Sequence, residues 1–282
     1  DNVINAAESG QVIAVTGPVG GDARAGDTVT LVVNGVTYTG TATAGLTYSI
    51  SVAGSDLAAD PTIDASVAVT DATGNTATGT TVHTNSVDLL PPAAPMVEIR
   101  EDANNDGRLS APEISGDADV RVTLPGNAVA GDTLTISDGT VTRTFVLTPA
   151  DITAGHVDTS FANPADGATM IVTAGLVDRA GNVSPTGSDL ASRDSTPPTA
   201  PITLSDSALT SGDTATVTII FSEPVTGLDN SDVTVENGTL GALISSDGGV
   251  TWTGTFTPSA NIEDTTNVVS VASTYTDVAG NA

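Results

Sequence analysis

The sequence has no cysteine and no lysine among its 282 residues. The absence of cysteine excludes disulfides, zinc–thiolate sites and cysteine nucleophiles. The seven bases are all arginine and face 34 acidic residues, so the formal net charge is −27. A chain this acidic has no basic patch with which to bind a nucleic-acid backbone. No apolar run reaches the roughly 18 residues of a membrane span, and no signal-peptide pattern opens the sequence.

Aromatic residues and good helix formers are also scarce. Aromatics make up 3% of the chain, Trp252 is the only tryptophan and glutamine occurs once. A hydrophobic content of 39% is too high for a disordered acidic tail. Threonine and valine dominate, and β-branched residues fit pleated, half-buried surfaces. The 29 glycines and 15 prolines mark turns between strands, so the composition predicts an all-β protein. The length suits two or three domains.

Three short motifs recur along the chain and divide it into repeats. Proline clusters fix φ and resist both helix and sheet, so they predict short, stiff connectors near residues 89–95 and 195–201. We therefore predict three domains, at residues 1–90, 91–196 and 197–282. The recurring motifs are Asp-x-x-Gly-Asn at 71–75, 178–182 and 277–281, Gly-Asp-Thr at 26–28, 131–133 and 212–214, and the proline clusters at 91–95 and 197–201.

Alternating runs joined by turn dipeptides indicate β-hairpins within the repeats. In the first repeat, residues 28–33 and 36–41 flank Asn34-Gly35, and Asp138-Gly139 gives the same signal in the second. Six or seven strands per repeat predict an all-β fold of three tandem immunoglobulin-like β-sandwich domains, the third of a divergent sub-type. Domains this small bury only about 60–65% of their unfolded surface. Since the chain has no disulfide, we expect another stabilising feature in these domains, and a bound metal ion is the obvious candidate.

Residues 102–113 match the full Asp-x-[Asp/Asn]-x-[Asp/Asn]-Gly-x5-Glu pattern of a calcium loop. Ca²⁺ is a hard cation that takes about six to eight oxygen ligands, and the central glycine allows the sharp turn. The flanking residues resemble strands rather than helices. We therefore predict a calcium loop placed between two strands, against the alternative of a solvated acidic loop. The predicted ligands are Asp102, Asn104, Asp106, the backbone carbonyl of Arg108, Ser110 directly or through water, and Glu113 with both carboxylate oxygens.

The first eight residues resemble the end of the same loop. Asp1 and Glu8 have the spacing of Asp106 and Glu113. We expect the sequence as given to begin inside this loop, which would leave the metal site of Asp1 and Glu8 incomplete.

The Asp-x-x-Gly-Asn turns predict a second kind of metal site. In the immunoglobulin topology this turn is the F–G loop, which lies beside the B–C loop at the pole where the chain enters the domain. Linker carboxylates lie at the same pole, and like charges this close repel unless a cation lies between them. The alternative is a plain Asx-type turn, because all three residue types favour turns. The predicted junction ligands are Asp178 and Asn182 with Asp88, Asp277 and Asn281 with Asp194 and Glu223 (Asp229 or Asp232 as further candidates), and Asp71 and Asn75 in the first repeat.

Together these motifs resemble one bacterial family. The loop at residues 1–8, the Pro-Pro-x-Ala-Pro linkers, the run Phe221–Val225 and the terminal Asp-x-x-Gly-Asn-Ala are similar to the tandem Ig-like repeats of giant adhesins. Those adhesins are exported by type I secretion and belong to the RTX or biofilm-associated class. The resemblance covers all three repeats. It implies long extracellular rods that Ca²⁺ stiffens at the domain junctions, which hold a terminal ligand-binding region away from the cell. The incomplete loop at residues 1–8 departs from the family pattern.

Other motifs are assigned structural roles. Residues 245–252 match the Asp-box of sialidase-like propellers, which is a hairpin turn, and we expect Trp252 to pack in the core of the third domain. His83 and His156 have no acidic residue at metal-ligand spacing, and no Gly-x-Ser-x-Gly pattern supports a serine nucleophile. The sequence therefore predicts no enzyme activity.

The preferred hypothesis is a structural stalk segment of a secreted bacterial adhesin, with Ca²⁺ as its cofactor. Three domains of this length would form an extended rod of roughly 110–135 Å. The expected partners are the neighbouring Ig-like domains of the same chain, and host-cell or abiotic surfaces reached through other parts of the protein. We expect a monomer with no nucleic-acid partner and no membrane insertion in this segment. Two alternatives stay open: a module in which one domain, above all the third, binds a glycan or host protein, and an accessory module of a surface enzyme.

Overall fold

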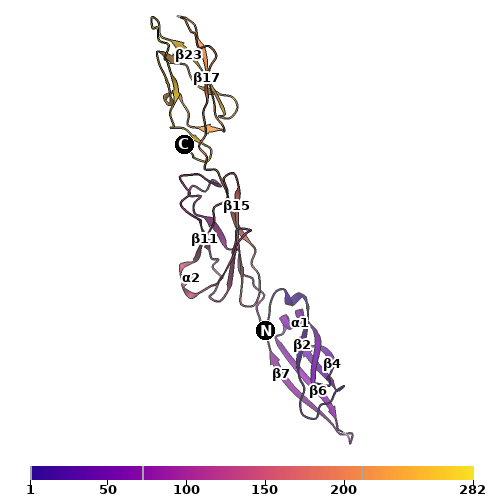
Figure 1. The fold of residues 1–282 in the computed structure, drawn as a ribbon. Coiled ribbons are helices and arrows are strands. Elements are labelled where there is room, and N and C mark those ends of the chain that lie inside the picture. The colour runs from indigo at the N-terminus through magenta and orange to yellow at the C-terminus, as the bar shows by residue number, and fades with distance from the viewer. Residues whose placement is uncertain (1, 72, 211) are drawn as a thin grey trace. The chain divides into compact units, whose positions relative to one another are not determined.

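The computed structural model describes residues 2–71, 73–210 and 212–282, and these are almost entirely β-strand and loop (Figure 1). The chain divides into two compact units. Unit 1 holds residues 1–97, 122–157 and 173–188, and unit 2 holds residues 98–121, 158–172 and 189–282. The predicted division into three domains stays a prediction, because the two units share the middle repeat. The all-β, Ig-like fold class is confirmed.

The first part of unit 1 contains two antiparallel sheets. The predicted hairpin around Asn34-Gly35 is confirmed: both residues have positive φ, at 48° and 73°, as a tight two-residue turn requires. One sheet pairs β2 (Val12–Pro18) with β5 (Thr47–Ala53), and the other has the order β4 (Val36–Thr41), β3 (Thr28–Val33), β6 (Thr62–Thr70), β7 (Thr76–Thr84). The smaller elements are β1 (Val3–Ile4), η1 (Glu8–Gly10), α1 (Gly54–Ala59) and β8 (Ser86–Val87), with β1 and β8 parallel.

Strand alternation builds the core of this sandwich. In β3, Val29, Leu31 and Val33 are fully buried while the residues between them are partly exposed or exposed. Since successive strand side chains point to opposite faces, one face of β3 packs inward and the other faces outward. Ile50, Val52, Leu57 and Ile63 complete the buried cluster from the opposite sheet, α1 and β6.

The remainder of unit 1 belongs to the middle repeat. Here β12 (Thr133–Ser137) pairs antiparallel with β13 (Thr142–Val146) and with residues 173–177 of β15 (Thr169–Val177). The short helix α2 (Pro149–Ala154) starts at a capping box in which Thr148 and Asp151 satisfy each other's backbone N–H groups. It ends at Gly155, whose φ of 74° is the left-handed conformation that glycine adopts at no steric cost.

Unit 2 holds the rest of the middle repeat and the third. A three-stranded sheet has the order β14 (His156–Phe161), β11 (Ala118–Thr123), β9 (Met96–Ile99), and β10 (Arg108–Leu109) pairs parallel with β16 (Gly187–Arg193). The third repeat has a sheet of order β17 (Ile202–Leu204), β18 (Ala215–Ile220), β23 (Thr251–Pro258), β21 (Gly238–Leu240), with β22 (Ile244–Ser245) also on β23. Its other elements are η2 (Asn230–Asp232) and the strand pairs β19 (Val225–Thr226) with β25 (Thr276–Asp277) and β20 (Val233–Val235) with β24 (Val269–Val271).

Aromatic residues form part of the core of the third repeat. Phe221 and Tyr275 are buried and meet edge to face with ring centroids 4.8 Å apart. Trp252 packs against this core as expected, and its Nε1–H donates to the carbonyl of Gly249 at 3.0 Å inside the hairpin. Within the described residues, the helices are all too short or too polar to cross a bilayer.

Candidate metal sites

The predicted calcium loop at residues 102–113 is held in shape by its own hydrogen bonds. The two carboxylate oxygens of Asp102 accept from the backbone N–H groups of Asp106 (2.9 Å) and Gly107 (2.8 Å), and Asp102 is buried. Asp106 in turn accepts from the N–H of Arg108 at 2.9 Å. Gly107 has a φ of 79°, so the sharp turn falls where the pattern requires glycine.

The acid that closes the loop lies against Ser110. One oxygen of Glu113 accepts from both the backbone N–H (3.0 Å) and the hydroxyl (2.7 Å) of Ser110. The carboxylates of Asp102, Asp106 and Glu113 are not all within 4.8 Å of one another, so this loop is not drawn together around one point. Asn104 uses its amide on Asp106 (N–H donor, 3.1 Å, and carbonyl acceptor, 2.9 Å).

Residues 5–8 of unit 1 reproduce the closing part of this loop. Glu8 accepts from the backbone N–H of Asn5 at 3.1 Å, as Glu113 does from Ser110. The loops also follow matching strands, because β1 pairs parallel with β8 as β10 pairs with β16. The equivalence predicted from the sequence is therefore seen in the described residues, while Asp1, the other predicted ligand, lies outside them.

In unit 1, the amide of Asn182 connects three segments of the chain. Its Oδ1 accepts from the backbone N–H of Ala6 at 2.7 Å, and its Nδ2 donates to the carbonyl of Asp88 (3.0 Å) and to Asp178 Oδ2 (2.8 Å). Asn182 is buried, with 3% of its surface exposed. We call this arrangement the Asn182 bracket.

In unit 2, the amide of Asn281 makes the same set of bonds, which we call the Asn281 bracket. Its Oδ1 accepts from the N–H of Ala111 at 2.7 Å, and its Nδ2 donates to the carbonyl of Asp194 (2.8 Å) and to Asp277 Oδ2 (2.7 Å). Asn281 is 1% exposed. Both asparagines were predicted as calcium ligands, and in the structure their amides join the turn, the linker and the preceding loop.

Only at the Asn281 bracket does a set of three carboxylates come together in the part of the chain that the structure describes. One oxygen each of Asp194, Glu223 and Asp277 lie within 4.8 Å of one another. Asp277 is buried and the other two are partly buried. Burial raises the pKa of Glu223, and the nearby charges of Asp194, Asp277 and Asp166 raise it further. Asp194 lies in the linker and Glu223 in the loop after β18. Asp277 lies where β25 meets the last turn, and Asp166 lies in the loop before β15.

The donor set at this cluster fits a hard divalent cation. Three carboxylates supply oxygen ligands at a spacing that one ion can bridge, and no described base pairs with any of them. Like charges held this close and partly out of water repel, and a divalent cation removes that cost. The sequence placed all three residues at this junction. It did not single out Asp166, which accepts hydrogen bonds from Ser195 and Thr196 and whose pKa those bonds lower to about 2.

The first repeat has the same turn without a bracket. Asp71 accepts from Thr73 and Asn75, and the Asn75 Nδ2 donates to Asp71 and Thr73. These side-chain bonds lower the pKa of Asp71, first among them the bond from Asn75. Both residues are exposed, and among the described residues their side chains bond only within the turn, which has the geometry of a plain Asx turn.

At the unit 1 bracket, one acid points elsewhere. The Asp88 carboxylate accepts from the N–H of Leu90, and Asp88 joins the bracket through its backbone carbonyl. In η2, Asp229 and Asp232 cap each other's backbone N–H groups, so these further candidates serve the local turn.

Comparisons with known proteins agree with this architecture. The bacterial Ig-like domain family matches residues 194–282. A Ca²⁺-stabilized adhesin with which an Antarctic bacterium binds ice is 30% identical over 98% of this chain and 70% of its own, with a TM-score of 0.51. An Ig-like domain of the M. primoryensis ice-binding adhesin is 52% identical over 31% of this chain and 86% of its own (TM-score 0.30). A 1.5-MDa bacterial ice-binding adhesin is 27% identical over 99% and 90% of the two chains (TM-score 0.45). No curated protein matches the chain.

Proposed function

Because the chain belongs to the bacterial Ig-like repeats of large adhesins, we propose that it is a stalk segment in which Ca²⁺ fixes neighbouring domains at a junction. The segment then acts as a secreted spacer at the bacterial surface and performs no chemistry. Three repeats arranged as an extended rod would hold a binding region elsewhere in the protein away from the cell. Contact with host cells, other surfaces or a biofilm would fall to that region.

The observation that carries the proposal is the carboxylate cluster of Asp194, Glu223 and Asp277. When bound there, Ca²⁺ would supply two positive charges among three acids. Asp194 would hold it from the linker, Glu223 from the loop after β18 and Asp277 from the last turn. An ion held from a linker and from two loops of the domain that follows resists bending between them, because any bend pulls ligands away from it.

The neighbouring residues prepare this site by hydrogen bonding. Asp277 Oδ1 accepts from the N–H groups of Gly280 (2.7 Å) and Asn281 (2.8 Å), which fix the direction of its carboxylate. The Asn281 bracket holds the linker carbonyl of Asp194, so the linker acid is brought to the turn before any ion binds. The loop at residues 102–113 contributes the N–H of Ala111 to the same bracket.

The low calcium of a cytosol and the higher calcium outside a cell suggest how such a stalk would be exported. At free calcium about 100 times Kd, binding would stabilise the folded state by about 2.7 kcal/mol. The junction would stay loose inside the cell and become fixed after secretion.

The deciding experiment is calcium titration calorimetry together with thermal unfolding in Ca²⁺ and in EDTA. We expect a calcium-dependent rise in the unfolding temperature in the parent chain and its loss in Glu223→Gln. Asp71→Asn serves as the matched control, because Asp71 has the position of Asp277 in a turn that is exposed and has no carboxylate cluster. This variant should keep the calcium-dependent rise in unfolding temperature. Equal unfolding curves in Ca²⁺ and EDTA for the parent chain would contradict the proposal.

The alternative of a glycan-binding third domain gains no support from Trp252, which packs on the core.

A further inference from the structure

The Asp-box hairpin, residues 245–252, contacts the loop that carries Glu223. Two backbone hydrogen bonds join the hairpin to that loop, one on each side of Glu223. They run from the N–H of Phe221 to the carbonyl of Val250 (2.8 Å) and from the N–H of Val225 to the carbonyl of Gly249 (3.1 Å). Since these bonds hold both ends of the short segment around Glu223, the hairpin limits where this carboxylate can lie.

The two backbones come closest at Gly249. This residue is buried and has a φ of 98°, and a Cβ added to it would lie 2.6 Å from the carbonyl oxygen of Val225. Non-bonded atoms do not pack that closely. Gly248 also has a positive φ, 79°, but a Cβ added there would meet nothing within 4 Å. Contact with the Glu223 loop therefore requires glycine at position 249 and not at position 248.

The carbonyl of Gly249 accepts a second hydrogen bond, from Trp252. The indole Nε1–H donates to it at 3.0 Å, and the ring packs against the core of the third repeat. The N–H of Gly249 in turn donates to the hydroxyl of Ser245 at 3.0 Å. The hairpin backbone that meets Val225 is thus fixed both to the core and within the hairpin itself.

The same loop is also joined to the two segments that carry the other acids of the cluster. Val225 pairs with Asp277 between β19 and β25. The N–H of Ser222 donates to the carbonyl of Thr199 in the linker at 2.9 Å, and the N–H of Thr199 donates to the Ser222 hydroxyl at 3.0 Å. The linker and the last turn each supply an acid to the cluster, whereas the hairpin supplies position alone.

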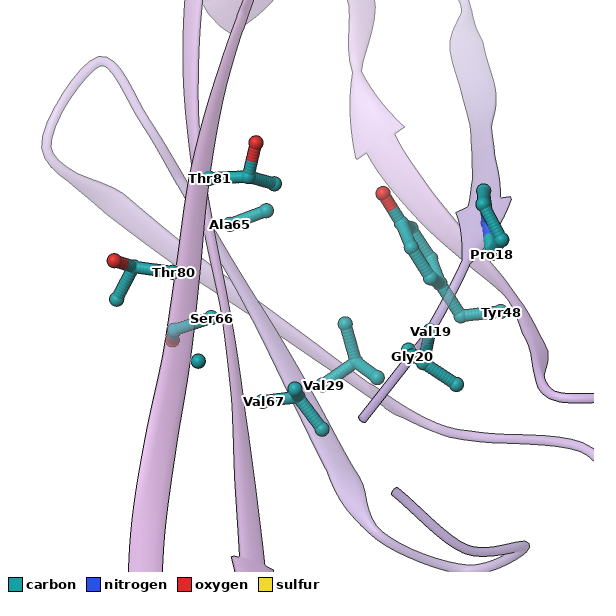
Figure 2. Close-up of a pocket in the computed structure, with 11 residues that line it drawn as sticks. Pro18, Val19, Gly20, Val29, Tyr48, Ala65, Ser66, Val67, Thr80 and Thr81 are labelled. Carbon is teal, nitrogen blue, oxygen red and sulfur yellow. The ribbon is translucent and has the colours of Figure 1, made fainter. Parts of the chain in front are cut away.

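The Asp-box pattern occurs once in the sequence, in the third repeat. A cavity in the first repeat is of another kind. Figure 2 shows this pocket, of about 210 Å³, with Pro18 and Tyr48 across from Ala65 and Thr81. The residues that line it are all uncharged, so their side chains offer no carboxylate to a cation. The hairpin is therefore the feature to connect with the metal site.

We infer that the Asp-box hairpin is the positioning element of the site formed by Asp194, Glu223 and Asp277. It holds the Glu223 loop in place before the ion binds, so less freedom is lost on binding. Groups that orient metal ligands typically change metal affinity about 10- to 100-fold. The inference rests on the proposed function, because it requires the cluster to take Ca²⁺. Since Trp252 and Val225 share the carbonyl of Gly249, the ion also acts on the indole.

The first measurement is a calcium titration of the full chain, followed by calorimetry and by tryptophan emission. Trp252 is the only tryptophan, so the emission reports on the hairpin alone. We expect a saturable change in emission with the Kd that calorimetry gives.

Two matched variants test the contact with the Glu223 loop. Gly249→Ala places a methyl group against the Val225 carbonyl and should weaken calcium binding at least about tenfold. Gly248→Ala puts the same methyl group at a positive φ in open space and should leave Kd within about twofold. In EDTA, the amide of Val225 should exchange faster in Gly249→Ala than in Gly248→Ala, because its bond to the hairpin is disturbed.

Circular dichroism checks that each variant is folded. If Gly249→Ala is not, Trp252→Phe keeps a ring in the core, removes the N–H donor and should weaken calcium binding about threefold, as expected for one neutral hydrogen bond. Calcium binding by the parent chain with an unchanged Kd in the folded variant would overturn this inference alone. So would equal weakening by the two alanine variants, or unchanged emission at saturating calcium. No calcium binding by the parent chain would overturn the proposed function as well.

Discussion

The two asparagine brackets share every backbone contact and differ in charge. Asn182 and Asn281 accept from an alanine N–H of the preceding loop and donate to the carbonyl of a linker aspartate at nearly the same distances. In unit 1, the loop after β11 ties the linker with a neutral side chain: Asn127 accepts from the N–H of Ala93 and donates to the carbonyl of Pro91. In unit 2, the loop after β18 brings the carboxylate of Glu223 to Asp194 and Asp277.

This difference shows that holding the linker and binding a cation are separate properties of the junction, although the same short motif is present at both. Holding a linker against a turn requires an amide with one acceptor and two donors, and both brackets have it. Binding a cation requires several uncompensated carboxylates at one place, and the described residues gather these at Asn281 alone. We therefore expect the unit 1 bracket to depend on hydrogen bonds and the unit 2 bracket to depend on hydrogen bonds and on calcium.

The largest effect is expected from Asn281→Asp. The substitution keeps the shape of the side chain but replaces the two-donor nitrogen, so that a third oxygen faces Asp277 and the Asp194 carbonyl in a buried position. We expect a loss of about 3 kcal/mol of unfolding free energy in EDTA, measured by urea denaturation. Asn182→Asp should lose less because fewer acids surround it, and Asn75→Asp, in the exposed turn, should lose about 0.5 kcal/mol. Equal losses at all three positions would show that the brackets add nothing to the turn.

The effect of Glu223→Gln on stability should have opposite signs in EDTA and in Ca²⁺. In EDTA the substitution removes one of three crowded charges, so the unfolding temperature of unit 2 should stay equal or rise. In Ca²⁺ it removes a ligand, and at free calcium about 100 times Kd the chain should lose most of about 2.7 kcal/mol of stabilisation. Differential scanning calorimetry under both conditions measures this. A variant that is destabilised equally in EDTA and Ca²⁺ would mean that Glu223 has only a packing role.

The hydrogen bonds of Asn127 to the linker of unit 1 should contribute the same stability with and without calcium. Asn127→Ala removes the two linker bonds and should cost about 1 kcal/mol, since the side chain is exposed and each neutral bond contributes modestly. The cost should be the same in EDTA and in Ca²⁺. If calcium changed it, the unit 1 junction would hold an ion too, and the contrast between the brackets would fail.

Much of the fold was predictable because local chemistry determines it. The Asn34-Gly35 hairpin, the repeated turns and the Asp-box hairpin depend on residues that are neighbours in sequence, and all three are present. The junction partners of Asp178 and Asp277 were predictable from the Ig topology, which fixes the loops that share a pole. The structure brings each to its expected linker residue.

The chemistry of each junction was not predictable from the motifs. The pattern Asp-x-x-Gly-Asn is identical in the three turns, yet one is a plain exposed turn, one a bracket and one a bracket with a carboxylate cluster. Glu223 was predicted from the run Phe221–Val225, but Asn127 and Asp166 were not, because they lie in loops whose contacts depend on tertiary packing. Similarly, the alternation at Ile13 and Val15 predicts a strand, and only the sheet order shows that β5 is its one paired strand among the described residues.

The smallest expected effect is a pH dependence that only unit 2 should have. The folded-state pKa of Glu223 is raised above its unfolded value, so protonation favours the folded state. Its contribution to stability is therefore fully present below the unfolded pKa of about 4.5 and is lost as the pH rises through the folded pKa. In EDTA, lowering the pH from 7 toward 5 should raise the unfolding temperature of unit 2. Glu223→Gln should reduce that rise, and Glu101, whose pKa burial also raises, accounts for the part that remains. In Ca²⁺ the dependence should reverse, because protons then compete with the ion for the same oxygens.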